Sequence, residues 1–485
     1  MIAEFLIEDI KIVIIPIINL ILVLLVIYLN RRHSENTLFW VFLSAIIPIG
    51  GFIIFMIFGY NHYSDKRFKL KAKDDIKIKK MVEDQVKHLK NAMKEDLKDP
   101  ELVRFTEMIR MLLLTDDAII TNNNKVTNYS DGNEKFDDLF KDIAKAKNFI
   151  HLEYYIIRND DLGKKLVKVL AAKAREGVEI RLLKDGVGCK ALPRKFFKEL
   201  TDAGGEVVGY FERRLGIYLR LNNRNHRKIA VIDGKIAYVG GYNIGVEYLG
   251  KGPLGSWRDA ALRIEGYGAL VAQIRFVLDW SYETGKLREI DLKYFPEQKN
   301  YDGVTIQIVS SGPDSYDEKI KHGYVKMINS AKKSVYLQTP YFVPDTAIAD
   351  ALRIAVLSGV DVRIMIPCKP DHPFIYWAGY ANVGWLLENG VRVFTYDDGF
   401  IHAKTIVVDG LVSSVGSANW DIRSFKLNFE TNAFIYDRKT SEDMKKRFLN
   451  DVEKHCTELT LKGYKARSNI IKMKETFALL FKEVL

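Results

Sequence analysis

The sequence predicts an α/β protein of two lobes related by a pseudo-twofold axis, each a mixed β-sheet flanked by helices, behind an N-terminal two-helix transmembrane hairpin. Two observations lead to this fold class. The pattern H-x-K-x4-D occurs twice, at residues 226–233 and again at residues 402–409. Two long apolar stretches also lie close together near the N-terminus.

The apolar stretches cover residues 12–29 and 38–58, and neither contains a charged residue. As helices they would be about 27 and 32 Å long, which is enough to cross the hydrocarbon core of a bilayer. A pair of buried core helices is the alternative, but no polar face is visible in either stretch. A cleavable signal peptide is not expected, because acidic residues stand where the basic ones of a signal belong. We therefore expect a transmembrane hairpin over residues 1–60.

Residues 61–115 are predicted to form a basic amphipathic helical linker. Lysine and arginine are frequent between residues 66 and 80, and an apolar stripe at helical spacing follows between residues 82 and 97. Between the two apolar stretches, the only lysine or arginine residues are Arg31 and Arg32. Because cytoplasmic loops retain basic residues, we expect a multi-pass protein of the cell membrane whose large C-terminal part is cytoplasmic.

The rest of the chain repeats one order of elements: helix, strand, helix, strand and hairpin. Residues 146–153 parallel residues 331–338, and residues 177–182 parallel residues 359–364. Helices between strands imply βαβ units and a largely buried, mixed sheet in each lobe. The duplication therefore extends well beyond the two motifs.

A polar stretch rich in Pro, Gln, Asn and Gly divides the repeats, so lobe 1 is expected at 116–298 and lobe 2 at 299–485. In each lobe a run of β-branched or small apolar residues, 229–232 or 405–408, ends in Asp-Gly, which is a strong hairpin signal. On a strand, the histidine and the lysine two residues later point to the same face. The site formed by the two motifs should lie between the lobes.

Composition agrees with a protein that binds anions. The formal net charge is +11, and 28% charged residues coexist with 48% hydrophobic ones, which excludes a disordered chain. Basicity alone also fits a nucleic-acid binder, but the apolar stretches favour lipid. Cys189, Cys368 and Cys456 match no metal-ligand spacing, so we expect reduced thiols, no disulfide and no metal.

The motif residues point to phosphate chemistry. Each copy places a histidine, which can act as nucleophile or base, beside a cation: His226 with Lys228, and His402 with Lys404. Pooled across the axis, these groups would surround one anionic tetrahedral group, and a phosphodiester fits that description. Glycines in the turns that follow would let the backbone approach the phosphate closely. These turn residues are Gly240, Gly241 and Asn243 in the first copy and Gly416, Ser417 and Asn419 in the second.

The sequence resembles the phospholipase D superfamily, whose defining signature is this doubled motif. Within the superfamily it is most similar to the bacterial cardiolipin synthases. The closer likeness is carried by the strings RNHRK at 224–228, GGYNIG at 240–245, WRD at 257–259, FIHAK at 400–404 and DIRSFKLNFE at 421–430. With the apolar N-terminus, the resemblance covers nearly the whole chain.

The resemblance implies a phosphatidyltransferase that uses no cofactor. His226 would attack one phosphatidylglycerol while His402 protonates the departing glycerol, which leaves a phosphatidyl-histidine intermediate. A second phosphatidylglycerol would then accept the phosphatidyl group and give cardiolipin. Symmetry leaves open which histidine attacks first, and the family alone favours His226. Phosphatidylglycerol and anionic membrane lipids are the expected partners, no nucleic acid is expected, and the sequence leaves oligomer formation open.

The resemblance also implies roles for other motif residues. The phosphate would be bound by Lys228, Lys404, Asn243, Asn419, Ser417 and Gly241. Asp259 and Glu430 would each hydrogen-bond a catalytic histidine and fix its tautomer. Asp233 and Asp409 belong to the catalytic signature, but as turn residues they are expected to stabilise the hairpins rather than to touch substrate.

Three alternatives stay open. A hydrolase of the same superfamily, a transphosphatidylase with a different alcohol acceptor and a catalytically silent scaffold share the same motifs, although two intact motifs disfavour the scaffold. Arg224 ends a basic run from Arg213 that could be an interfacial surface or a plain basic loop. Residues 470–485 could lie on the membrane or pack on lobe 2.

Overall fold

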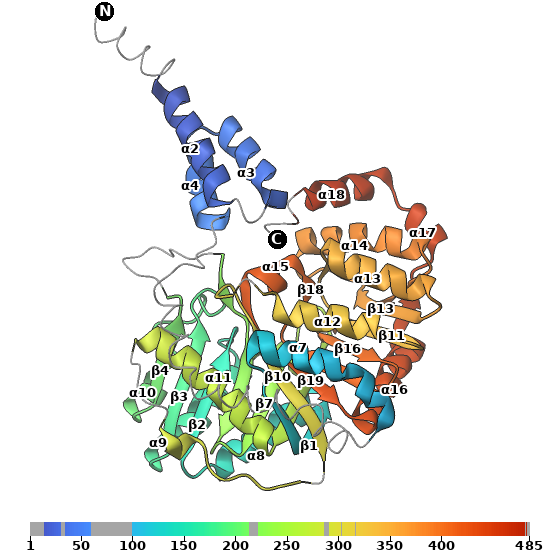
Figure 1. Ribbon diagram of the computed structural model, residues 1–485. Coiled ribbons are helices and arrows are strands. Elements are labelled where there is room, and N and C mark those ends of the chain that lie inside the picture. The colour runs from blue at the N-terminus through green and yellow to red at the C-terminus, as the bar shows by residue number, and fades with distance from the viewer. Residues whose placement is uncertain are drawn as a thin grey trace, which may run out of the picture.

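The computed structural model describes residues 14–30, 34–59, 99–212, 222–285, 291–301, 303–315, 317–480 and 482 (Figure 1). Two predicted segments fall largely outside these ranges. They are the basic linker expected over 61–115, which is described only from Asp99 onward, and residues 213–221 of the basic run that ends at Arg224.

The N-terminal apolar region forms helices that pack on one another, α2 (Ile15–Leu29), α3 (Ser34–Ile46), α4 (Gly50–Ile54) and the π-helix η2 (Phe55–Gly59). The second apolar stretch is therefore not the single helix expected over residues 38–58. It breaks at Pro48, which has no N–H to donate, and at Ile49, whose φ is 63°. Within the described residues, no helix combines the length and the apolar character that a bilayer crossing requires.

The strands of lobe 1 are β1 (Ile120–Tyr129), β2 (Phe149–Tyr154), β3 (Glu179–Asp185), β4 (Glu206–Tyr210), β5 (Arg224–Asn225), β6 (Lys228–Ile232), β7 (Ile236–Gly240), β8 (Ser256–Arg258) and β9 (Ala261–Glu265). Those of lobe 2 are β10 (Val304–Ser311), β11 (Ser334–Gln338), β12 (Phe342–Val343), β13 (Asp361–Pro367), β14 (Arg392–Tyr396), β15 (Gly399–Ile401), β16 (Thr405–Val408), β17 (Val412–Gly416), β18 (Trp420–Asp421), β19 (Asn428–Tyr436) and β20 (Cys456–Glu458).

One continuous mixed sheet runs through both lobes, where the sequence predicted one sheet in each. From the centre outward, lobe 1 places β1, β9, β7, β6, β2, β3 and β4 side by side, and lobe 2 places β10, β19, β17, β16, β11, β13 and β14. The two orders match strand for strand. β1 and β10 pair antiparallel at the centre, so the pseudo-twofold axis passes between them.

Helices cover this sheet in both lobes (Figure 1). Lobe 1 has α8 (Gly132–Lys145), α9 (Asp161–Arg175), α10 (Lys198–Asp202), the 3-10 helices η4 (Val246–Leu249) and η5 (Leu292–Tyr294), and α11 (Tyr267–Thr284). Lobe 2 has α12 (Lys319–Asn329), α13 (Thr346–Leu357), α14 (Pro373–Glu388), α15 (Ile422–Lys426), α16 (Arg438–His455), α17 (Leu461–Lys465) and α18 (Asn469–Leu479). α8 illustrates how the local sequence starts and orients these helices. Asp131 caps its first turn by accepting from the N–H groups of Asn133 and Glu134, and the apolar stripe that follows is buried.

The end of the predicted linker belongs to the core of lobe 2. Residues Pro100–Phe105 form the 3-10 helix η3 and Thr106–Asp116 form α7. Met108 and Leu112 of α7 are fully buried in the same cluster as Tyr324 of α12. The chain thus crosses lobe 2 before β1 starts lobe 1, and Arg104 forms an ion pair with Asp409 there.

The lobes share an apolar core and exchange strand pairings. Ile229 and Val231 of lobe 1 lie in one buried cluster with Val407 and Val415 of lobe 2. β15 of lobe 2 pairs parallel with β8 of lobe 1, and β5 of lobe 1 pairs parallel with the start of β19 of lobe 2. These two crossings bring the motifs together.

The C-terminal helix α18 packs on lobe 2, which was one of the two alternatives for this segment. Ala478 is buried against Ala378 of α14 and Val343 of β12. Ile470 and Met473 on the same helix and Leu480, which follows it, remain exposed.

Candidate active site

Each motif lies where a strand enters the middle of the sheet. His226 lies two residues before β6, and His402 lies three residues before β16. The hairpin turns predicted from the two Asp-Gly pairs are confirmed. Asp233 and Asp409 have φ values of 51° and 56°, and the glycine after each also has a positive φ.

The turn aspartates hold the hairpins to the neighbouring strands. The carboxylate of Asp233 accepts hydrogen bonds from the backbone N–H groups of Lys147, Asn148 and Phe149, at 2.8, 2.7 and 2.9 Å. Asp409 accepts in the same way from the three residues that lead into β11, at 2.9, 2.7 and 2.7 Å, and it also binds Arg104. This geometry supports the structural role expected for both residues, although they belong to the signature.

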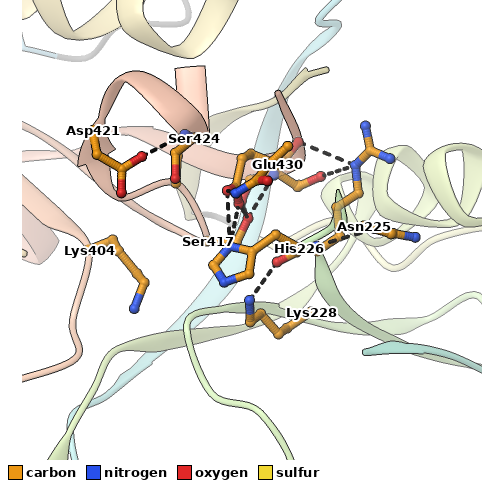
Figure 2. Close-up of polar contacts among 12 residues, drawn as sticks. Asn225, His226, Lys228, Lys404, Ser417, Asp421, Ser424 and Glu430 are labelled. Carbon is orange, nitrogen blue, oxygen red and sulfur yellow. Dashed lines mark hydrogen bonds and ion pairs between the residues drawn. The ribbon is translucent and has the colours of Figure 1, made fainter. Parts of the chain in front are cut away.

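Each histidine is anchored by a carboxylate of the opposite lobe. Nδ1 of His226 lies 2.9 and 3.0 Å from the two carboxylate oxygens of Glu430, and Nδ1 of His402 lies 2.6 Å from Oδ2 of Asp259. Figure 2 shows the Glu430 contact. Because an ionised carboxylate only accepts, Nδ1–H is the donor in both pairs, and Nε2 of each neutral ring carries the lone pair.

The backbone explains why the pairs cross. The N–H of His226 donates to the carbonyl of Phe429 at 2.9 Å, and the N–H of His402 donates to the carbonyl of Arg258 at 2.7 Å. In each case the acceptor is the residue directly before the carboxylate. The interlobe strand pairings therefore set each histidine beside the acidic residue of the other lobe.

The motif lysines are buried beside their own histidines. Nζ of Lys228 donates to the carbonyl of His226 at 2.6 Å, and Nζ of Lys404 donates to the carbonyl of His402. Burial lowers the pKa of Lys228 well below its usual value and that of Lys404 to about 8. An anionic group beside these amines would offset this cost and favour their charged form, so the two lysines suit an anionic ligand.

Burial also favours the neutral form of both imidazoles. It lowers the pKa of His226 well below the ordinary value and that of His402 to about 4, and the neighbouring lysines add to the effect. Burial raises the pKa of Glu430 to about 7, against the opposing effect of Lys228. A neutral histidine is the form that can act as nucleophile or base.

Two expected phosphate ligands have other contacts. The hydroxyl of Ser417 donates to Glu430 at 2.5 Å and accepts from the N–H of Thr431 at 2.9 Å, so it orients the carboxylate (Figure 2). A Cβ on Gly241 would come within 2.1 Å of Oδ1 of Asp259. The missing side chain at Gly241 thus makes room for the carboxylate that anchors His402.

The asparagines differ from each other. Asn243 accepts from the N–H of Ile156 at 3.1 Å and donates to the hydroxyl of Tyr248 at 3.0 Å, which lies 3.4 Å from Nδ1 of His402. Asn419 is buried, and its Oδ1 has no hydrogen-bond partner among the described residues. Asn419 is therefore the asparagine better placed to turn its amide toward a substrate.

Several site residues were not identified from the sequence. Arg227, between the histidine and lysine of the first motif, is buried and donates to Asp279 at 2.7 Å and to Thr431 at 3.0 Å. The ring of Tyr155 lies 4.7 Å from that of His226, and the ring of Trp257 lies 5.1 Å from that of His402. The signal for Arg227 and Trp257 was their place inside the quoted strings. Tyr155 had no such signal.

Glu153, on β2, is fully buried next to the first motif. Its carboxylate accepts from Nδ2 of Asn225 at 2.6 Å, and burial raises its pKa to about 8. Nothing in the described part of the chain groups three or more His, Cys, Asp or Glu side chains in a way that could hold a metal ion.

Comparison with known proteins agrees with the geometry. A family model described as "Cardiolipin synthase, PLD-like domain" matches residues 139–251 and 324–452, which include both motifs. The chain is 45% identical over 474 residues to cardiolipin synthase 2 of Staphylococcus epidermidis, covering 97% of this chain and 96% of that protein. It is also 45% identical over 478 residues to a cardiolipin synthase of Listeria innocua, covering 98% of both.

A solved structure shares the fold. The phosphatidylserine synthase of Haemophilus influenzae superposes with a TM-score of 0.60 at 15% identity, over 78% of this chain and all of that one.

Proposed function

The chain belongs to the cardiolipin synthase family with phospholipase D-like domains, and we propose that it transfers a phosphatidyl group from one phosphatidylglycerol to another, giving cardiolipin and glycerol. The observation that carries this proposal is the pair of crossed contacts, His226 with Glu430 and His402 with Asp259. They leave two Nε2 atoms for one phosphodiester, with a lysine beside each histidine.

In the first step Nε2 of His226 attacks phosphorus, and the bond from phosphorus to the glycerol oxygen breaks. When the anionic phosphodiester binds, its charge adds to that of Asp259 and favours a proton on Nε2 of His402. His402 gives this proton to the departing oxygen, so a phosphatidyl-histidine and free glycerol result. Glu430 holds the attacking ring by its Nδ1–H and stabilises the positive charge that the ring acquires.

In the second step a hydroxyl of another phosphatidylglycerol replaces the histidine. Neutral His402 takes the hydroxyl proton, the new oxygen–phosphorus bond forms, and the phosphorus–nitrogen bond to His226 breaks. One phosphodiester replaces another, so the exchange needs no external energy source.

Lys228, Lys404 and the amide of Asn419 would stabilise the negative charge that develops on the non-bridging oxygens in the transition state. Each preorganised donor of this kind contributes about 2 to 4 kcal/mol to transition-state stabilisation. The ammonium groups stay close to phosphorus because each is tied to the carbonyl of its own histidine.

The apolar N-terminus would hold the enzyme at its lipid substrate. Leu20, Ile21 and Leu24 of α2 are more than half exposed, as are Leu38 and Phe42 of α3, which suits an apolar surrounding. We extend the proposal to a membrane hairpin with the catalytic lobes on the cytoplasmic side, supported by the basic residues that follow it in sequence. This orientation is tested in intact cells that carry single cysteines, placed before α2 or in lobe 1, with a thiol reagent that does not cross the membrane. Labelling of the lobe 1 cysteine from outside would contradict the proposed orientation.

The function is tested with the purified full-length protein in vesicles of labelled phosphatidylglycerol. Cardiolipin and glycerol should form in equal amounts, and His226→Ala and His402→Ala should abolish both. His455→Ala, a surface histidine paired with Asp398, is the matched control. Phosphatidic acid as the main product, or cardiolipin formation by His226→Ala, would contradict the proposal.

A further inference from the structure

Two arginines from different lobes meet beside the first histidine. Arg224 on β5 precedes His226 by two residues, and Arg423 lies on α15 shortly before Glu430. Nη1 and Nη2 of Arg423 donate to the side-chain and backbone oxygens of Asn222, at 3.0 and 2.6 Å. Arg224 donates to the carbonyl of Asn223 at 2.9 Å. Both guanidinium groups are thus held on the same short segment that leads into the motif.

This pair carries positive charge without a bound carboxylate. Among the described residues neither arginine forms an ion pair. The acidic groups that act on Arg423, Asp421 and Asp185, are engaged elsewhere. Asp185 accepts from the N–H groups of residues 187, 188 and 225, and Asp421 accepts from the N–H of Ser424. Burial, with added repulsion from Arg224, lowers the pKa of Arg423 to about 10.

Tyr155 connects the arginines to the reacting centre. Its ring lies 4.7 Å from that of His226 and 5.2 Å from Nζ of Lys228. At its other end, Arg224 and Arg423 both act on the phenol and favour its ionised form, against the effect of burial. Figure 2 shows Ser424, the residue after Arg423, beside the pair formed by Glu430 and His226. The two cations therefore act at the phenol end of Tyr155, whose ring contacts the histidine that attacks phosphorus in the proposed function.

We propose that Arg224 and Arg423 form a second anion subsite, which binds the phosphodiester of the acceptor lipid. This inference rests on the proposed function. The acceptor hydroxyl of a phosphatidylglycerol is separated from its own phosphate by a three-carbon bridge, a span similar to that of the tyrosyl side chain. Guanidinium groups bind phosphate through paired N–H donors, and holding the phosphate fixes the hydroxyl near phosphorus and His402.

The subsite would separate lipid transfer from transfer to other alcohols. Water and free glycerol have no phosphate, so they gain nothing from Arg224 and Arg423. A phospholipid alcohol gains two charge-assisted contacts, which raises its concentration at the phosphatidyl-histidine. The enzyme would thereby favour cardiolipin over the return of phosphatidylglycerol or the release of phosphatidic acid.

The test compares two acceptors on the same enzyme in vesicles of phosphatidylglycerol. One assay measures cardiolipin, and the other measures incorporation of labelled glycerol into phosphatidylglycerol, which needs the same intermediate but an acceptor without phosphate. In Arg224→Gln and Arg423→Gln the ratio of cardiolipin to incorporated glycerol should fall about tenfold or more. Arg423→Lys, which keeps the charge, should recover part of the ratio.

Two controls keep the outcome clear. Arg392→Gln removes an exposed arginine of β14 that pairs with Glu458, and it should leave the ratio unchanged. Asn222→Ala removes the side-chain contact of Arg423 but keeps the backbone contact and the charge, so a loss as large as that of Arg423→Gln would point to misfolding of the segment. An equal fall of both activities in the arginine variants would overturn the subsite. Absence of cardiolipin from the unaltered enzyme would instead overturn the proposed function.

Discussion

The two lobes have the same strand order but surround their histidines differently. His226 meets both oxygens of Glu430 and the edge of one aromatic ring, that of Tyr155. His402 meets one oxygen of Asp259 and stands among three aromatic rings, those of Trp257, Tyr248 and Phe400 at 5.1, 5.8 and 6.1 Å. The shared backbone fixes where the imidazoles lie, and the unequal surroundings favour unequal roles.

The residue between histidine and lysine differs in the same way. Arg227 ties the first motif to Asp279 on α11 and to Thr431 on β19, whereas Ala403 of the second motif is a buried apolar residue. The first histidine is thus held by a network of charges, and the second by packing. A rigid nucleophile and a ring that exchanges protons with successive alcohols fit these two settings.

Replacing the anchoring carboxylates gives the largest expected effects. Glu430→Gln and Asp259→Asn should each slow cardiolipin synthesis on the order of 10³-fold, because an amide can present an N–H to Nδ1 and impose the wrong tautomer. If the lobes divide the chemistry, Glu430→Gln mainly slows formation of the phosphatidyl-enzyme, and Asp259→Asn slows both proton transfers. Acid-quenched single-turnover experiments with labelled lipid separate these steps. Identical effects of the two variants on every step would break the comparison.

The pH profile sharpens the same comparison. Burial raises the pKa of Glu430 to about 7, and only its ionised form accepts from Nδ1–H of His226. The rate of phosphatidyl-enzyme formation should therefore be low below pH 7 and should increase as the pH rises through about 7. The Glu430→Gln variant should lose this increase near pH 7, whereas the Asp259→Asn variant should keep it.

Arg227→Met should destabilise the fold by about 3 kcal/mol, because it leaves part of the buried charge of Asp279 without its partner. The double variant Arg227→Met with Asp279→Leu should recover most of that loss. Urea unfolding followed by circular dichroism measures both. An unchanged free energy of unfolding in the single variant would show that the charged network of lobe 1 is dispensable.

The turn aspartates should differ in their effect on stability, because among the described residues Asp409 forms an ion pair and Asp233 does not. Asp409→Asn should cost about 2 kcal/mol and Asp233→Asn about 1 kcal/mol, since Asp409 also binds Arg104. Burial alone would raise the pKa of Asp409, but three backbone donors and Arg104 lower it below 3.8. Its contribution is therefore complete above about pH 4 and is lost as pH falls further. Melting temperatures of both variants at pH 7 and pH 3 test the difference and its disappearance in acid.

Lys135→Met should act in the opposite direction and stabilise the protein by about 1 to 3 kcal/mol. Lys135 is buried on α8 among aromatic rings, 3.8 Å from that of Phe136, and burial lowers its pKa to about 7. The repeat places Ile320 at the matching position of lobe 2. The folded-state pKa lies below the unfolded one, so the gain is full below about pH 7 and shrinks as pH rises toward 10.5. A variant that melts lower than the original at pH 6 would contradict this.

Local signals predicted much of this structure. The β-branched runs and the Asp-Gly pairs fixed both hairpins, because strand propensity and left-handed turns depend on a few neighbouring residues. The repeated spacing also led to a common site. The family resemblance, rather than a local signal, implied that Asp259 and Glu430 bind the histidines. In the second apolar stretch Pro48 and the glycines after it already marked the break that the structure shows.

Features that depend on tertiary pairing were not predictable. Neither Asp259 nor Glu430 carries a local sign of which histidine it meets, because the choice follows from β8 with β15 and from β5 with β19. The same holds for Gly241, whose missing Cβ makes room for Asp259, and for α7, which precedes lobe 1 in sequence but packs in lobe 2. A single sequence does not show which distant residues pair in the folded protein.

The diagonal arrangement of histidine and carboxylate also bears on how such a chain can change over generations. Either half taken alone holds an imidazole without its anchor and an anchor without its imidazole. A shift in the position of His226 is felt first by Glu430, and a shift of His402 by Asp259, so each change acts on the other half. The two repeats can therefore diverge in sequence only through changes that keep both crossed contacts. The duplicated halves must be inherited together, because neither has a complete site alone.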